Sequence, residues 1–149
     1  MVVTAEAVSL SALFHADETA WLDAMAELAA RGQVAHLDYH NLGEYLTDMA
    51  RRDRREVFSR LVVLLAHILK WEYQPERRTG SWRATLREQR RELRQLFESA
   101  TLRNHAAIVF TEAYAEARLQ AADETEVGAS AFPLAPPWGV DDVLEARES

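Results

Sequence analysis

The chain has 149 residues, of which 48% are hydrophobic and 28% are charged, and its formal net charge at pH 7 is −7. This length and composition are typical of one globular domain with a buried core, and they exclude an intrinsically disordered chain. The sequence contains no cysteine, which excludes disulfides, thiolate metal sites and a cysteine nucleophile, and which fits a reducing compartment.

The charge is unevenly distributed along the chain. Residues 51–103 hold 14 Lys and Arg against 7 Asp and Glu, a net charge of +7, and the remaining residues carry a net charge of −14. One interpretation is a basic middle packed beside acidic flanks in one fold, and the other is a basic surface for an anionic partner. We favour the first, because acidic flanks weaken the long-range attraction of nucleic acid.

No stretch of the sequence has the pattern of a membrane span or a secretory signal. The longest apolar run, residues 61–66, resumes after His67 for only two residues, far short of the ~20 that a span needs. The weakly apolar N-terminal stretch is not preceded by a basic region. We therefore expect no membrane association and a cytoplasmic location.

The first predicted elements are two helices joined by a short connection. Asp17 is a suitable N-cap for the first helix, and Gly32 suits the left-handed residue that follows its last turn. Either Asp38 or Asn41 can cap the second helix.

The apolar pattern then marks the centre of the fold. Apolar residues recur at helical spacing up to Met49 and again over residues 57–71, with a lapse between them. The sequence leaves open whether the helix over residues 41–73 is continuous or broken near residues 50–55. Nearly every side of residues 61–69 is apolar, which predicts the buried central helix of a bundle.

Two more helices and a tail follow. Pro75 ends the central helix, because the residue before proline disfavours helical backbone. Ser81 is the predicted cap of the next helix, and Ser99 or Thr101 opens the one after it. A final short helix is expected near residues 141–146.

Together these elements predict an all-α fold. We expect a single domain, residues 1–149, built as a helical bundle of four to five main helices with a core over about residues 17–122. Residues 127–149 form a tail containing Pro and Gly that is expected to pack on the bundle.

A long motif in the middle of the chain resembles a known family. The motif runs from Leu64 to Pro75 and continues with Arg77-Arg78, Ser81-Trp82 and residues 87–90. It is similar to the core motif of the bacterial "domain of unknown function 29" family. The resemblance spans about Asp17 to Leu144 and includes Asp17, Trp21, Leu37, Asp38, Asn41, Leu42, Leu102, Tyr114, Ala117, Phe132, Pro133, Pro137 and Trp138.

The resemblance implies an almost wholly α-helical protein, and it implies no particular activity. This chain departs from the family pattern at one place. Where the family often has two adjacent glutamates after an Asn-Leu pair, this chain has Glu44-Tyr45. A role that needs both carboxylates is therefore weakened here.

The first candidate site lies around His67, in the most apolar helix. A buried imidazole needs a hydrogen-bond partner, and Lys70 follows one turn later. In a catalytic pocket His67 would be an acid or base and Lys70 would hold an anion; in a structural cluster both would be satisfied by neighbours. We favour the structural cluster. The residues expected to converge here are His67, Lys70, Trp71, Tyr73, Trp82, Glu88 and Tyr114.

The second candidate site is an arginine stripe on one helix face, at positions i, i+4, i+7 and i+11: Arg83, Arg87, Arg90 and Arg94. Such a face can bind anionic groups such as phosphates. Glu88 and Glu92 interrupt it, so we favour a solvated, ion-paired face. Acidic residues of a second copy would make the same stripe a dimer interface.

The sequence predicts no metal, no cofactor and no recognisable catalytic motif. His36 and His40 have the spacing of metal ligands on a helix, but they precede the predicted second helix, and two imidazoles do not complete a tetrahedral site. Phosphate-loop, nucleophile-elbow and zinc-protease motifs are absent.

We therefore expect a non-catalytic protein-interaction module whose ligand is a protein partner or a second copy. The alternatives are nucleic-acid binding through the arginine stripe and a small-molecule or enzymatic pocket around His67.

Overall fold

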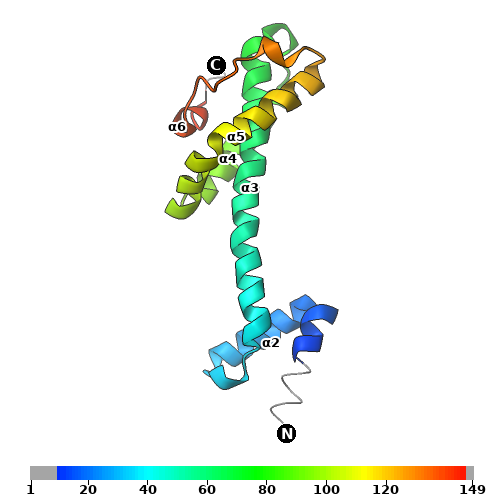
Figure 1. Cartoon of the computed structure of the whole chain (residues 1–149), viewed down its shortest axis with the longest axis vertical. Helices are drawn as coiled ribbons and strands as arrows, with labels where there is room; N and C mark the ends of the chain where they lie inside the picture. The colour runs from blue at the N-terminus through cyan, green and yellow to red at the C-terminus, as the bar shows by residue number, and fades with distance from the viewer. Residues whose placement is uncertain (1–9, 147–149) are drawn as a thin grey trace. The chain divides into compact units, whose positions relative to one another are not determined.

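The computed structural model describes residues 10–146. All regular structure within that range is helical and none of it is strand, which confirms the predicted all-α class. The N-terminal stretch considered as a signal and the last residues of the predicted tail, 147–149, lie outside the described residues. The long helices are α2 (Glu18–Ala30), α3 (Tyr39–Tyr73), α4 (Gly80–Leu96) and α5 (Ala100–Thr125) (Figure 1).

Shorter helical elements connect and follow the long helices. A helix covers residues 10–16, and the others are the 3-10 turns η1 (Val34–His36), η2 (Pro75–Arg77) and η3 (Ala129–Ala131) and the helix α6 (Val140–Val143). The final helix is thus shorter than the sequence predicts. Among the described helices, none combines the length and apolar character that crossing a bilayer requires.

Helix α3 is continuous through residues 50–55, which resolves the question that the sequence leaves open. The reason is local: neither glycine nor proline occurs between Glu44 and Gln74, and arginine is a good helix former. The lapse in apolar spacing marks solvent-exposed turns of one helix, because Arg51, Arg52 and Arg55 are exposed.

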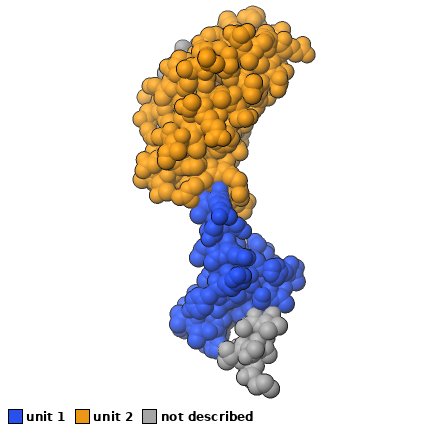
Figure 2. All heavy atoms as spheres, in the orientation of Figure 1, with its two compact units in different colours: residues 1–51 blue, residues 52–149 orange. Residues whose placement is uncertain are grey.

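The chain divides into two compact units, residues 1–51 and residues 52–149 (Figure 2). In the first unit Asp38 joins α2 to α3. The indole Nε1 of the fully buried Trp21 donates to Asp38 Oδ2 at 3.1 Å, and Asn41 Nδ2 donates to the same oxygen at 2.8 Å. Asp38 also accepts from the backbone N–H of Asn41 at 3.5 Å, so Asp38 caps α3.

The other helix starts follow the predicted capping residues, with one exception. Asp17 caps α2 and Ser99 caps α5, each by accepting a backbone N–H from the first turn. Ser81 does not cap α4. Thr79 does so, by accepting the backbone N–H of Trp82 at 3.1 Å, because its extended backbone places its hydroxyl before the first helical residue.

The core of the second unit surrounds the C-terminal part of α3. The fully buried side chains of this part are Val57, Leu61, Leu64, Leu65 and Leu69. Helix α5 presents small buried residues to this core, which let helices approach closely: Ala106, Ala113, Ala117 and Ala121. The segment after α5 adds Phe132, Trp138, Val140 and Val143 to the same cluster.

Candidate functional site

Lys70 is the centre of a polar cluster in the second unit. Its Nζ lies 2.5 Å from Glu124 Oε2, 3.5 Å from His67 Nε2 and 5.0 Å from the centre of the Trp82 ring. The Lys70 side chain is 6% exposed, while that of Glu124 is 41% exposed. The cluster joins α3, α4 and α5, and it includes three of the residues predicted to converge around His67.

His67 has a partner on each ring nitrogen. Nδ1 lies 2.9 Å from the carbonyl oxygen of Val63, and since a carbonyl only accepts, Nδ1 carries the proton. Burial is the largest cause that lowers the pKa of His67 below its ordinary value of 6.5, and the Lys70 charge lowers it further. The neutral ring leaves Nε2 as an acceptor for Lys70. This arrangement orients Lys70 and leaves no ring nitrogen directed at a substrate.

Glu124 is the partner of Lys70 that the sequence does not reveal. Burial acts to raise the pKa of Glu124, but hydrogen bonds from Lys70 and Gln120 outweigh that effect, and the pKa lies below its ordinary value of 4.5. The carboxylate is therefore ionised at neutral pH. Lys70 and Glu124 are 54 residues apart, so no local spacing rule connects them.

The other predicted members of the pocket lie in different contacts. The Trp71 ring faces two guanidinium groups, with Arg78 Cζ at 4.8 Å and Arg83 Cζ at 5.4 Å from its centre. Arg78 Nε also donates to the backbone carbonyl of Trp71 at 2.8 Å. Trp71 therefore serves as a cation–π platform at the junction of α3 and α4.

Two tyrosines of the predicted pocket contact the tail. The Tyr73 ring packs edge-on against Phe132 with centres 6.0 Å apart, and the Tyr114 hydroxyl donates to the carbonyl of Pro133 at 2.5 Å. Burial raises the pKa of the Tyr114 hydroxyl above 10.0, as does the neighbouring Tyr73. Glu88 is exposed on α4. The structure thus separates six of the seven predicted residues into a lysine cluster, an arginine–tryptophan stack and tail contacts, and it places Glu88 in none of them.

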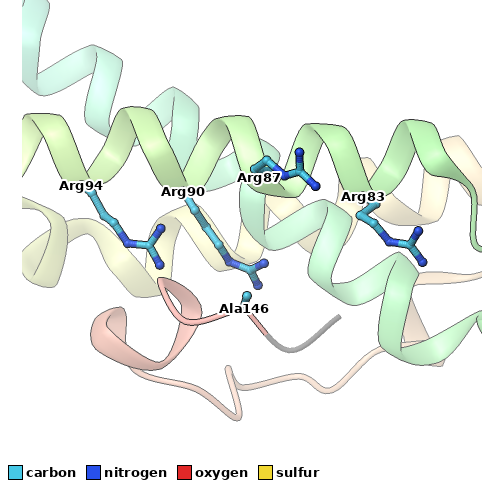
Figure 3. A pocket seen from close by; sticks show the side chains of 5 residues that line it. All are labelled: Arg83, Arg87, Arg90, Arg94 and Ala146. Atoms are coloured by element: carbon cyan, nitrogen blue, oxygen red, sulfur yellow. The ribbon is translucent and has the colours of Figure 1, made fainter. Parts of the chain in front are cut away.

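The arginine stripe, in contrast, lines one pocket. This pocket has a volume of about 160 Å³ and is lined by Arg83, Arg87, Arg90, Arg94 and Ala146 (Figure 3). All four arginines come from α4, and Ala146 comes from the described end of the tail. We call it the arginine pocket. The helical spacing of the arginines predicts their common face, whereas the contribution of Ala146 has no counterpart in the sequence pattern.

The tail orients two arginines of the pocket. Arg90 Nε donates to the carbonyl of Val143 at 2.9 Å, and Arg94 Nη2 donates to the carbonyl of Leu144. The tail is also held by an ion pair of 2.7 Å between Arg103 and the outward-facing Asp141. Because a backbone carbonyl is neutral, the hydrogen bond to Leu144 orients the Arg94 guanidinium without cancelling its positive charge.

Glu92, one of the two acidic residues that interrupt the stripe, is paired with arginines outside the pocket. Glu92 contacts Arg91 at 2.9 Å and Arg60 at 3.7 Å, and neither arginine lines the pocket. Over residues 10–146 there is no carboxylate ion-paired with Arg83, Arg87 or Arg94. Three of the four arginines that line the pocket therefore have no acidic partner among the described residues.

His36 and His40 belong to the first unit and lie on different elements. His36 ends η1, and His40 is in the first turn of α3, where its Nε2 lies 3.6 Å from Glu44. His40 also borders an open hollow of about 550 Å³ along α3. Across the described part of the chain, no three histidine or acidic side chains come close enough together to hold a metal ion.

The comparisons with known proteins agree with the motif found in the sequence. The family model "Domain of unknown function DUF29" matches residues 13–147, nearly the whole chain. No curated protein and no solved structure matches. The residues of the central motif lie at the C-terminal end of α3, in η2 and in the first part of α4, and the Trp21, Asp38 and Asn41 positions form one hydrogen-bonded cluster of the first unit. On this match the chain belongs to the DUF29 family.

Proposed function

We propose that this protein is a non-catalytic interaction module of the bacterial cytoplasm, which binds an acidic segment of a protein partner in the arginine pocket. The observation that carries the proposal is that four arginines of one helix line a single pocket. Arginine is the side chain best suited to fork-like recognition of carboxylates and phosphates.

The lysine cluster supports a non-catalytic role. A general acid or base has to present a proton or a lone pair to a substrate, and both ring nitrogens of His67 are engaged by Val63 and Lys70. Lys70 is in turn engaged by Glu124. This cluster satisfies its own charges and holds three helices together.

The charge distribution favours a discrete acidic ligand over a nucleic acid. The chain as a whole has a net charge of −7, which disfavours a long polyanion, whereas four arginines line one pocket. A short acidic peptide carries few charges beyond those that the pocket can pair, so repulsion by the net charge of the chain is smaller for it.

The test is fluorescence anisotropy with the full chain and a short fluorescein-labelled peptide rich in glutamate. We expect binding that weakens as salt is added, because charge pairs at a surface are screened. Arg87→Ala should reduce the affinity by about tenfold, the loss of one charge-assisted contact.

Arg91→Ala is the matched control. Arg91 is on the same helix, but it is paired with Glu92 and does not line the arginine pocket. Equal losses in the Arg87 and Arg91 variants would show a diffuse charge effect and would overturn the proposal. Tighter binding of a single-stranded oligonucleotide than of any acidic peptide would replace it with nucleic-acid recognition.

A further inference from the structure

The arginine pocket has the size of one anionic group. Its volume of about 160 Å³ is roughly half of the smallest pockets that hold a whole small-molecule ligand, about 300 Å³. A volume of this size suits a single oxyanion with the atoms that attach it.

The charge of the pocket exceeds that of one carboxylate. Within the described residues no acidic side chain pairs with Arg83, Arg87 or Arg94, and all three line the pocket from different points along α4 (Figure 3). A carboxylate offers one negative charge and two oxygens. A phosphomonoester offers a charge of about −1.5 to −2 at neutral pH and three acceptor oxygens.

The arginines are also oriented before any ligand binds. The tail carbonyls of Val143 and Leu144 hold Arg90 and Arg94, and the Trp71 ring lies beneath Arg83. Side chains that are held in place lose less conformational freedom on binding, which increases affinity for a group that fits them. Arg87 is exposed, as are Arg83 and Arg94, so its guanidinium is accessible to a ligand.

We infer that the arginine pocket binds a phosphomonoester, carried by a phosphorylated side chain of the partner. This inference rests on the proposed function, because it names the chemical group through which the acidic partner would be recognised. The guanidinium forks would donate hydrogen bonds to the terminal oxygens, as they do in other arginine-based phosphate sites.

The experiment uses the full chain and three labelled glycine–alanine peptides that differ only at the central residue: phosphoserine, glutamate or serine. Affinities are measured by fluorescence anisotropy in a buffer without phosphate. We expect the phosphoserine peptide to bind at least about tenfold more tightly than the glutamate peptide, and the serine peptide not to bind. Inorganic phosphate should displace the phosphoserine peptide.

The pH dependence gives a second readout. The second proton of a phosphomonoester is released with a pKa of about 6, so affinity for the phosphoserine peptide should fall as the pH drops through that value. The glutamate peptide should show no such fall there, because its carboxylate keeps its charge.

Variants locate the site. Arg87→Ala and Arg94→Ala should each weaken phosphoserine binding by about tenfold, and Arg91→Ala should leave it nearly unchanged. Circular dichroism checks that each variant is folded. Equal weakening by Arg91→Ala would place binding outside the arginine pocket and overturn the inference.

The failures of the two proposals are distinguishable. If the glutamate and phosphoserine peptides bind equally, the phosphomonoester inference falls and the acidic-partner proposal stands. If neither peptide binds, the phosphomonoester inference and the acidic-partner proposal are both wrong. If free inorganic phosphate binds but the phosphoserine peptide does not, the pocket is a site for a small anion, which also overturns both.

Discussion

Arg90 of α4 donates its Nε–H to the backbone carbonyl of Val143, 53 residues further along the chain, at 2.9 Å. This hydrogen bond is buried, and Arg90 itself is 2% exposed. A single residue thus lines the arginine pocket and fastens the tail, so the shape of the pocket depends on the docking of the tail.

Arg90→Met should destabilise the protein by about 2 kcal/mol, because it keeps the apolar stem but removes a charged donor from a buried carbonyl. Urea unfolding measures the change, and hydrogen exchange should show faster exchange over α6. Arg91→Met is the control on the solvent-facing side of α4 and should change stability by less than about 0.5 kcal/mol. Similar values for the two variants would contradict a structural role for Arg90.

Glu124→Gln should cost more stability than Lys70→Met. The first change leaves the buried Lys70 ammonium without its carboxylate, which is expected to cost about 3 kcal/mol. The second removes the buried charge and leaves Glu124, which is 41% exposed and is rehydrated by solvent. Urea unfolding of both variants tests the order, and the reverse order would show that the ion pair itself contributes little.

The free energy of unfolding should fall as the pH is lowered from about 7 toward 5. The pKa of His67 is below 6.5 in the folded protein, so the unfolded chain takes up a proton first as the pH falls through about 6.5. The pKa of Glu124 is also lower in the folded protein, so the free energy of unfolding should fall further as the pH approaches the ordinary glutamate value of 4.5. Urea unfolding at several pH values measures the fall, which His67→Gln should reduce. An undiminished fall in that variant would mean that other groups cause it.

Leu93→Ala should destabilise the protein by about 3 kcal/mol, since it removes a fully buried side chain of α4 and leaves a cavity in the core. The same substitution at Leu119, which is 54% exposed on α5, should cost less than about 1 kcal/mol. Thermal and urea unfolding compare the two variants. If the two variants lost similar amounts of stability, the Leu119 side chain would be buried in a contact between copies of the chain.

The helices and most of their ends could be predicted because their causes are local. Asp17, Asp38 and Ser99 cap the next few residues, and Pro75 stops α3 through its effect on the preceding residue. The prediction that Ser81 caps α4 is wrong, and the cause is again local. Thr79 and Ser81 are both acceptable caps, and the backbone of the turn decides between them.

The sites could be predicted only in part. The regular spacing of Arg83, Arg87, Arg90 and Arg94 is sufficient to place them on one face of α4, because a helix has a fixed period. Spacing did not predict that Ala146 and the tail carbonyls complete the pocket. The residues expected to converge around His67 come from several helices, and the folded chain distributes six of them over three environments and leaves Glu88 exposed.

The sequence by itself therefore determined the all-α class, the buried central part of α3, and the basic face of α4. Local propensity and periodicity act within a few turns of a helix, so they can be recognised without knowing which other helices pack against it. The tertiary structure alone decided that Lys70 pairs with Glu124 and that the tail orients Arg90 and Arg94. Those contacts join residues about 50 positions apart, and burying a charged or polar group requires a partner without specifying which distant residue supplies it.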